Sequence, residues 1–291
     1  MLEPGRRRAL LQIHFCVFLW GFTAILGKLI TLSALPLVWW RMACVTIALC
    51  LLPSFWRSLV SMPRGLVAIY AGIGIIVALH WVTFYAAIKL ANASVAATCM
   101  ALAPVFIAFV EPFVSGRRFD MRELVFGIAV VPGVALVAGG TPLHMRAGIA
   151  VGALSALLVA FFAIFNKRYI GSSRALTVTG IEMAAGALFL LAISGLLPDS
   201  FSIRIPSAHD AMLLLILAIG CTLLPYSLSL VALKKLSAFS TALAVNLEPV
   251  YAIGFAILLL GEQRELSASF YLGVAILLAT VVLHPVLVRQ R

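Results

Sequence analysis

The fold is decided by the stretch Leu90–Phe119, LANASVAATCMALAPVFIAFVEPFVSGRRF, and by its counterpart Leu236–Glu262, LSAFSTALAVNLEPVYAIGFAILLLGE. Each stretch is apolar and carries a proline near its middle, Pro104 or Pro249, with a glycine twelve positions later. A proline inside a helix removes a backbone hydrogen bond and frees a carbonyl. Within a membrane such a break is tolerated where protein or a wet cavity surrounds it. The sequence therefore predicts two kinked helices that face a packed interface or a pathway.

Composition indicates a protein that uses lipid as its solvent. Of the 291 residues, 64% are hydrophobic and only 11% are charged, and the mean hydropathy is +1.15. A soluble chain would carry about 25% charged residues. The net charge of +11 does not indicate nucleic acid, because the basic residues are spread over short loops rather than clustered on one element. The expected partners are the bilayer and a small molecule.

The cysteines predict neither disulfides nor a metal centre. All five fall inside apolar stretches, and no CxxC or Cys/His spacing appears. We interpret them as small packing residues and expect no metal and no cofactor.

Apolar runs of about 18–22 residues between polar breaks predict ten membrane spans. They lie near 11–31, 35–53, 66–88, 94–114, 123–141, 147–166, 175–196, 210–232, 237–260 and 267–288. The first follows three arginines, but it is longer than the apolar segment of a signal peptide, so we expect it to be retained. The tails would be 1–10 and 289–291.

Loop charges predict the orientation of these spans. If the N-terminus is cytoplasmic, fifteen lysines and arginines lie on the inside and five on the outside, while Arg41 stays within a span. This is the bias that membrane insertion requires. The prediction is a multi-pass protein of the cell (inner) membrane with both termini in the cytoplasm.

The two halves of the chain repeat each other. Matched segments are Trp20–Ile30 with Val159–Ile170, Val38–Ala43 with Thr179–Ala184, and Phe84–Ala91 with Ser229–Ser237. Because five spans are an odd number, the second copy must enter the membrane from the opposite side. We therefore predict an all-α fold of two inverted five-helix repeats, residues 11–143 and 144–288, an arrangement common in secondary transporters.

The chain resembles the EamA branch of the drug/metabolite transporter superfamily. The resemblance rests on WGFTAILGK from Trp20, on Arg41 in the second span, on the small residues before Pro104, and on NLEPVYA followed by LGE at Glu262. It covers nearly the whole chain and implies ten helices and export of small metabolites, often amino acids, including aromatic ones. One departure is that the first repeat has Ser-Gly-Arg where the second has LGE, so we expect Glu262 to be a solvated loop charge.

Charges inside membrane spans cost roughly 2.5–3.5 kcal/mol or more at the helix centre, so each one is a functional candidate. Arg41 could hold a substrate carboxylate through a bidentate contact, or it could be a structural partner of Glu248 or of a helix end. Glu248 could bind a substrate ammonium or a proton, or accept a hydrogen bond from backbone freed by Pro249. Glu182 matches Arg41 in the other repeat, but inversion places the two at opposite depths, so no direct pair is expected.

Aromatic residues are the next candidates for a substrate site. His80, Trp81 and Tyr85 could form a ring-lined pocket or a proton relay, whereas a histidine in such a place is more often a packing residue. Trp20 and Tyr226 are candidates for cavity walls, or for core packing or interfacial anchoring.

Small residues form a stripe on each proline-containing helix. Ala101 and Pro104 lie on the first stripe, and Asn246 and Pro249 lie on the second. Such stripes allow close helix packing. The alternative is that they line the cavity, for which Asn246 is the strongest candidate.

These observations predict a proton-coupled or facilitative exporter of a small zwitterionic metabolite, most often an amino acid, that works by alternating access. The alternative transporter is an antiporter of phosphorylated metabolites or nucleotide sugars, which would need several cations in its cavity. A membrane enzyme would need a nucleophile–base pair or a metal cluster, and no HExxH or GxSxG pattern is present. The sequence leaves the oligomeric state open and is compatible with a monomer.

Overall fold

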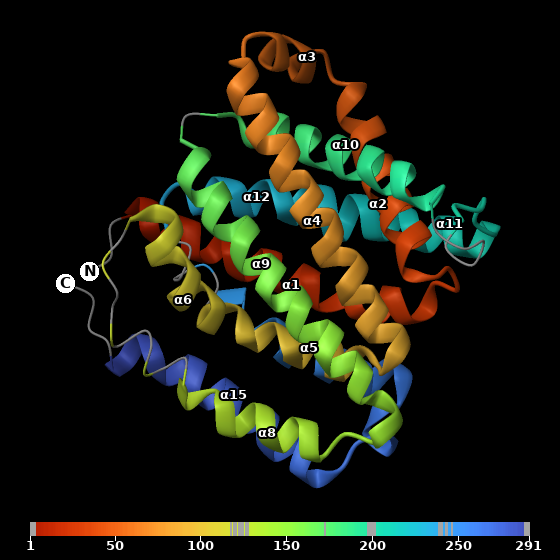
Figure 1. Cartoon of the computed structure of the whole chain (residues 1–291), viewed down its shortest axis with the longest axis vertical. Coiled ribbons are helices and arrows are strands. Elements are labelled where there is room, and N and C mark those ends of the chain that lie inside the picture. The colour runs from red at the N-terminus through yellow and green to blue at the C-terminus, as the bar shows by residue number, and fades with distance from the viewer. Residues whose placement is uncertain are drawn as a thin grey trace.

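The computed structural model describes residues 4–116, 118, 121, 125, 128–171, 173–196, 202–237, 241, 244–245 and 247–287. Within these ranges every regular element is helical, as the apolar runs predict. The helices follow one another through short connections and pack side by side (Figure 1).

The long elements occur in the order of the predicted spans. The α-helices are α1 (Pro4–Leu29), α2 (Ala34–Cys50), α3 (Pro53–Val60), α4 (Arg64–Leu90), α5 (Ala93–Cys99), α6 (Ala103–Ser115), α8 (Val131–Gly139), α9 (Arg146–Tyr169), α10 (Ala175–Ser194), α11 (Ala208–Leu215), α12 (Leu224–Leu233), α14 (Glu248–Phe255) and α15 (Ala268–Leu287). Short 3-10 turns are η1 (Met100–Leu102), η2 (Leu143–Met145) and η6 (Glu262–Arg264), and π-helical turns are η4 (Ile216–Leu223) and η5 (Ala256–Leu260).

The described helices support a multi-pass membrane protein. Six segments are long and apolar enough to cross a bilayer, or seven if the bent pair α2–α3 counts as one span. The predicted spans 123–141 and 237–260 lie partly outside the described residues, so the count of ten stays a prediction. Large apolar side chains point outward along these helices, for example Phe113 at 78% and Leu258 at 80% exposure. Lipid is the solvent that makes such exposure favourable.

One helix differs from the sequence expectation. The predicted span 35–53 ends earlier, and α3 follows it at an angle of 89°. Pro53 occupies the first turn of α3, where its missing N–H costs nothing. Phe55 from α3 is buried against Gly180 of α10, whereas Trp56 is exposed.

Both proline-containing helices are broken where the sequence predicts a kink. The α5 helix gives way to the 3-10 turn η1, and α6 then starts with Pro104 in its first turn. In the second half, Leu247 forms a turn and α14 starts at Glu248, with Pro249 in its first turn. The C-terminal glycines Gly116 and Gly261 both take the left-handed conformation, with φ of 66° and 70°. A residue without Cβ adopts this conformation at little cost.

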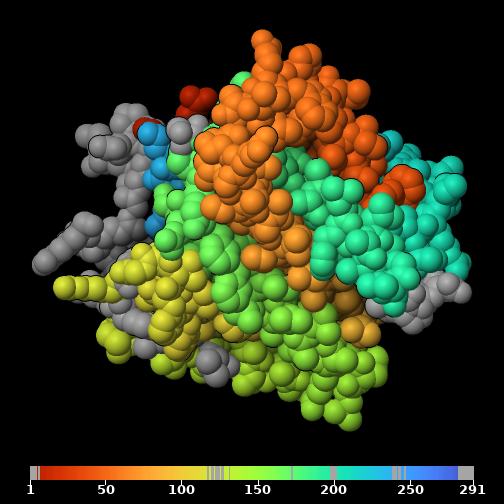
Figure 2. All heavy atoms as spheres, turned by 45° about the horizontal axis from the view of Figure 1, so that its top comes forward, coloured from red at the N-terminus to blue at the C-terminus, as the bar shows by residue number. Residues whose placement is uncertain are grey.

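Helix contacts define a central bundle and an outlying pair. The α4 helix packs against α9 and α10, α1 packs against α12 and α14, and α6 packs against α9. Three further contacts join α2 to α10, α5 to α14 and α8 to α15. The α8–α15 pair lies along one edge of the molecule, and α1 begins on the side where α15 ends (Figure 1). In Figure 2 the side chains of α4 lie between those of α9 and those of α10 on one face of the molecule.

The contact between α4 and α10 depends on glycine. A Cβ at Gly74 would collide with the backbone of Glu182, and one at Gly186 would collide with the Met42 side chain and lie 2.8 Å from the Gly74 carbonyl oxygen. Because glycine has no side chain, the two backbones can approach closely, as they do at small residues in membrane bundles.

We expect Gly74→Ala to destabilise the protein, because overpacking at a backbone contact typically costs about 1–3 kcal/mol. Gly72→Ala is the matched control, since a Cβ there meets nothing within 4 Å. The control should be neutral or stabilising, because alanine favours helix over glycine by about 1 kcal/mol. Thermal unfolding of the purified protein in detergent measures both variants. Equal melting temperatures for the two would contradict the close approach.

Candidate functional site

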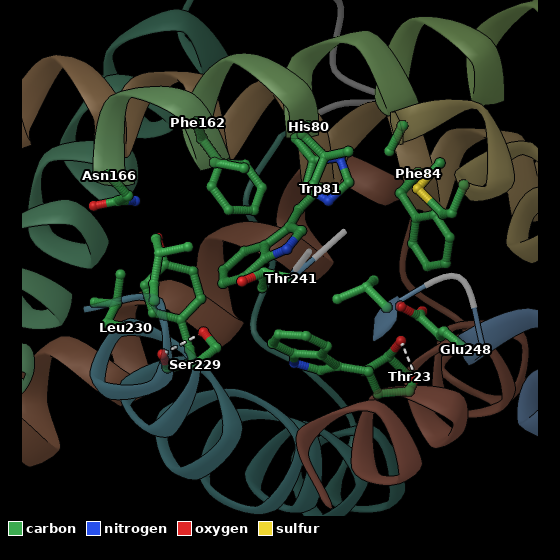
Figure 3. Close-up of a pocket in the computed structure, with 18 of the residues that line it drawn as sticks. Thr23, His80, Trp81, Phe84, Phe162, Asn166, Ser229, Leu230, Thr241 and Glu248 are labelled. Carbon is green, nitrogen blue, oxygen red and sulfur yellow. Dashed lines mark hydrogen bonds between the residues drawn. The ribbon is translucent and has the colours of Figure 1, made fainter. Parts of the chain in front are cut away.

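A cavity lies inside the central bundle and encloses about 1000 Å³, including the space at its mouth. Its walls come from α1, α2, α4, α9, α12, the two proline-containing segments and the turns beside them. The lining residues are Trp20, Thr23, Arg41, His80, Trp81, Phe84, Met100, Ala103, Ile107, Val159, Phe162, Ala163, Asn166, Tyr226, Ser229, Leu230, Leu233, Thr241, Val245 and Glu248. Trp81 projects into the middle of the cavity, with Asn166 toward one end and Glu248 toward the other (Figure 3).

Arg41 is fixed in the cavity wall by three contacts. Its Nε donates to Thr222 Oγ1 at 2.5 Å, and its NH1 donates to the Tyr85 hydroxyl at 3.0 Å. The Cζ atom lies 3.7 Å from the ring centroid of Trp81, a cation–π geometry. A guanidinium has five N–H donors, so these hydrogen bonds leave donors for a ligand. The side chain is 2% exposed, which means that its charge is directed into the protein and not to bulk solvent.

Glu248 supplies the opposite charge. Its carboxylate lines the cavity and makes no hydrogen bond to any other residue that the structure describes. It occupies the first position of α14, where the helix dipole favours a negative charge. Thr23 lies beside it in the close-up, with its hydroxyl bonded to the Trp20 carbonyl (Figure 3). No ion pair joins Glu248 to Arg41 in the described structure, although each is within electrostatic reach of the other.

His80 is held by Ser155 of α9. The His80 Nδ1 atom lies 2.9 Å from the Ser155 carbonyl oxygen and 2.8 Å from the Ser155 hydroxyl. The same hydroxyl donates to the His80 carbonyl at 2.9 Å. This network gives the Nδ1 atom of the imidazole its hydrogen-bond partners and joins α4 to α9. His80 therefore has a packing role in addition to its place in the lining.

Aromatic rings form the middle of the cavity. Trp81 contacts Tyr226 edge to face, with ring centroids 6.1 Å apart. Phe162 lies 6.3 Å from the Tyr226 ring and 5.6 Å from the His80 ring. The lining therefore offers π-faces and apolar edges in addition to the two charged groups.

The structure places six of the predicted site residues on the cavity lining. They are Trp20, Arg41, His80, Trp81, Tyr226 and Glu248. Tyr85 is fully buried outside the lining, where its hydroxyl positions Arg41. Glu182 is also behind the wall and accepts a hydrogen bond from Tyr226. Among the described residues, Arg41 bonds Thr222 and Tyr85, whereas Glu182 bonds Tyr226.

The small-residue stripe lies on a different face from the one that lines the cavity. Ala101, Pro104 and Pro249 are buried but are not among the lining residues. On the first proline-containing helix, the lining residues are Met100, Ala103 and Ile107. The stripe with Ala101 and Pro104 serves helix packing here, and the neighbouring face with Met100, Ala103 and Ile107 reaches the cavity. Asn246 lies outside the described residues.

Several lining residues were not predicted. Phe162 and Asn166 of α9 are the most prominent, together with Thr23 of α1. The repeat carries the signal that could have identified them: aligning Lys28 with Lys167 places Phe162 opposite Thr23. Transferring the Trp20 assignment across the repeat would have directed attention to the same face of α9.

One end of the bundle is closed by polar contacts between helices. At the end of α1, the Thr31 backbone N–H and hydroxyl donate to the two carboxylate oxygens of Asp210, at 2.9 and 2.6 Å. Lys89 at the end of α4 donates to the Ile30 carbonyl. The cavity lining instead reaches Asn166 and Leu233, close to the last turns of α9 and α12.

Glu262 completes this closed end, and the expectation that it is solvated is wrong. The side chain is 1% exposed, and its two oxygens accept from the backbone N–H groups of Ala93 and Ser94 at 3.1 and 3.0 Å. The Ser94 hydroxyl adds a third bond at 2.7 Å. The N-terminal donors of α5 need acceptors because they have no partner within the helix. The carboxylate of the second half thus caps a helix of the first half.

We expect Glu262→Ala to lower the melting temperature more than Glu265→Ala. The first change leaves buried backbone N–H groups without acceptors, which costs about 1–3 kcal/mol for each. Glu265 is exposed and accepts one bond from the Asn92 amide, so it is a matched control. Thermal unfolding in detergent compares the two, and an equal or larger effect of Glu265→Ala would contradict the capping role.

The sequence profile of the EamA-like transporter family matches this chain twice, at residues 7–139 and 146–285. A protein of Haemophilus influenzae described as an uncharacterized transporter is 33% identical over 104 residues, which is 36% of this chain and 61% of that protein. The matched stretch thus spans less than two thirds of that relative's length. A solved crystal structure of another protein is similar with a TM-score of 0.70 at 17% identity, covering 97% of this chain and 99% of the other. At that identity the likeness concerns the fold alone.

Proposed function

The chain belongs to the EamA-like transporter family, and on that premise we propose that it exports small zwitterionic metabolites, with amino acids as the leading class. Membership of this family supports a membrane transporter of small molecules. The residues that line the cavity support the proposed substrate class.

The observation that carries the proposal is the pair of opposite charges at the cavity. Arg41 and Glu248 both line it without forming an ion pair with each other. A zwitterion presents a carboxylate, which a guanidinium binds well, and an ammonium, which a carboxylate binds. The rings of Trp81, Tyr226 and Phe162 offer surface for an apolar or aromatic substrate side chain. An amino acid combines all three features.

Helix contacts support the arrangement of ten helices in two inverted repeats, residues 11–143 and 144–288. Exchanging the halves converts the α4–α9 contact into α12–α1 and the α6–α9 contact into α14–α1. The contacts α2–α10 and α8–α15 each convert into themselves, and the α5–α14 contact joins the two proline-containing helices, which exchange with each other. Such pairing is what a pseudo-two-fold relation between repeats produces. The family profile also matches once in each half.

The closed and open ends of the bundle support a mechanism of alternating access. The contacts of Asp210, Lys89 and Glu262 close one end, and the cavity lining extends toward the other. With the orientation predicted from loop charges, the closed end faces outward and the cavity faces the cytoplasm. Export then requires the outer contacts to separate as the halves rock and the broken helices rearrange.

The alternative, an antiporter of phosphorylated metabolites or nucleotide sugars, fits the cavity less well. Among the lining residues that the structure describes, Arg41 is the single permanent cation. A phosphate monoester carries close to two negative charges at neutral pH, and Glu248 would repel it. The balanced pair favours a zwitterion over a dianion.

Counterflow in proteoliposomes tests the proposed function. Vesicles containing the protein are loaded with an unlabelled amino acid, and entry of the same labelled amino acid is followed at equal pH on both sides. We expect saturable entry of one or more amino acids and none of sugar phosphates, with protein-free vesicles as the control. Entry of phosphorylated compounds alone, or no entry of any zwitterion across a full amino-acid panel, would overturn the proposal.

A further inference from the structure

A second polar group lies immediately behind the cavity wall. Glu182 on α10 has no exposed surface, and the Tyr226 hydroxyl donates to its Oε2 atom. Its Oε1 atom has no hydrogen-bond partner in the described structure. The backbone of Gly74 presses against the Glu182 backbone from α4, so this helix position is tightly fixed. A buried carboxyl with half of its acceptors unused is costly in a core.

Asn166 adds two more unpartnered polar atoms at the same place. Its side chain is fully buried, and both its amide oxygen and its amide nitrogen lack hydrogen-bond partners within the described residues. It lies near enough to interact electrostatically with Glu182 and Tyr226, though not in hydrogen-bond geometry. It also lines the cavity, at the end away from Glu248 (Figure 3). Glu182 is therefore linked to the cavity through Tyr226 and Asn166.

The position limits what Glu182 can bind. It is not a lining residue, whereas Tyr226 and Asn166 are, so a substrate ammonium in the cavity meets those two side chains first. A proton needs no such space, because a hydroxyl and one bridging water suffice to carry it. A site closed to organic cations but joined to the cavity by polar side chains suits a proton.

A continuous set of contacts joins Glu182 to Arg41, the residue that we propose binds the substrate carboxylate. Tyr226 bonds the carboxylate and packs edge to face on Trp81, and the Trp81 ring carries the Arg41 guanidinium at 3.7 Å. A change in the Tyr226 hydrogen bond therefore acts on a ring that shapes the cavity and supports Arg41.

The other ionisable side chains on the neighbouring helices donate to Glu182, bond other residues or are exposed. Glu182 is therefore the group in this cluster that we expect to titrate. Tyr226 on α12 bonds it, and Tyr70 on α4 lies within electrostatic reach while bonding the Tyr169 carbonyl and Ser173. On α2, Arg41 bonds Thr222 and Tyr85 instead. The charge on α3, Arg57, is exposed. On α4, His80 is held by Ser155.

We propose that Glu182 is the proton-binding residue of this transporter and that Tyr226 couples its protonation to the substrate cavity. The ionised carboxylate accepts a charge-assisted bond from Tyr226, and uptake of one proton converts that carboxylate to a neutral acid. Hydrogen bonds to ionised groups are roughly twice as strong as neutral ones, so protonation loosens Tyr226. The ring is then free to shift against Trp81, which changes how Arg41 is presented. This coupling rests on the proposed transport function, but proton binding itself does not.

Infrared difference spectroscopy tests proton binding without any substrate. Spectra of the purified protein in lipid, recorded over a range of pH, should show the carbonyl band of a protonated carboxyl that titrates. We expect Glu182→Gln to lose this band and Glu248→Gln to retain it. Tyr226→Phe keeps the carboxyl but removes the donor to its ionised form, so the band should remain with its midpoint at higher pH. A titrating band unchanged in both Glu182→Gln and Tyr226→Phe would overturn the proposal.

Transport then tests the coupling. We expect a pH gradient to drive amino-acid accumulation by the wild-type protein, and Tyr226→Phe to shift the pH dependence of that accumulation by the amount seen in its infrared titration. If Glu182→Gln does not fold, as judged by thermal unfolding, Tyr226→Phe still decides the question. Wild-type vesicles without any amino-acid counterflow would defeat the proposed function and leave the infrared result standing. Accumulation with an identical pH profile in wild type and Tyr226→Phe would defeat the coupling alone.

Discussion

Substituting Arg41 by Gln is expected to weaken binding of a zwitterionic substrate by at least about 30-fold. Loss of a buried charged partner costs about 2 kcal/mol or more, and each 1.4 kcal/mol is about tenfold in affinity. The effect should be large because Arg41 is the single permanent cation among the described lining residues. Concentration-dependent counterflow with one labelled amino acid measures it as a rise in the half-saturating concentration or a complete loss of entry.

Two further variants separate the charge of Arg41 from its structural contacts. Thr222→Val removes the acceptor of Arg41 Nε but keeps the guanidinium, so its effect should be small beside that of Arg41→Gln. Arg41→Lys keeps a charge but loses the planar fork and the stacking on Trp81, so an intermediate result is expected. An amine that lacks a carboxylate is the matched substrate control, because its entry should be insensitive to Arg41→Gln. Normal amino-acid entry by folded Arg41→Gln protein would refute the carboxylate assignment.

Much of this architecture is predictable from the sequence because a membrane leaves few choices. Apolar length gives the long helices, and the broken helices occur at Pro104 and Pro249 because proline cannot continue the hydrogen-bond ladder. Arg41 and Glu248 stand out because charges within spans are rare and expensive, and both do line the cavity.

The parts that the sequence does not predict depend on helix rotation and on distant contacts. Periodicity groups Ala101 with Pro104 but does not say whether that face meets a neighbour or a cavity, and the structure turns Ala103 to the cavity instead. Nothing in the local sequence of Glu262 shows that it caps α5, some 170 residues earlier along the chain. The same holds for Tyr85, whose role as a partner of Arg41 requires knowing how α2 and α4 pack.

Substituting Glu248 by Gln should change substrate selectivity in a way that no other variant does. Glu248 has no described hydrogen-bond partner to lose, so the fold should tolerate the change, and thermal unfolding checks this. The half-saturating concentration for an amino acid should rise about tenfold or more, because its ammonium loses a charged partner worth roughly 1.5–3 kcal/mol.

The deaminated analogue of the same amino acid provides the sharpest comparison for Glu248→Gln, since it keeps the carboxylate and side chain but has no ammonium. Its competition against labelled amino acid should be unchanged or stronger in the variant, because a cavity without the Glu248 charge repels an anion less. The opposite pattern should hold for Arg41→Gln, in which the amine competes normally and the deaminated acid does not. If Glu248→Gln weakened amino acid and deaminated analogue equally, the carboxylate would be shaping the cavity and not binding the ammonium. The proposal of a zwitterionic substrate therefore requires that Arg41→Gln weakens recognition of the carboxylate and that Glu248→Gln weakens recognition of the ammonium.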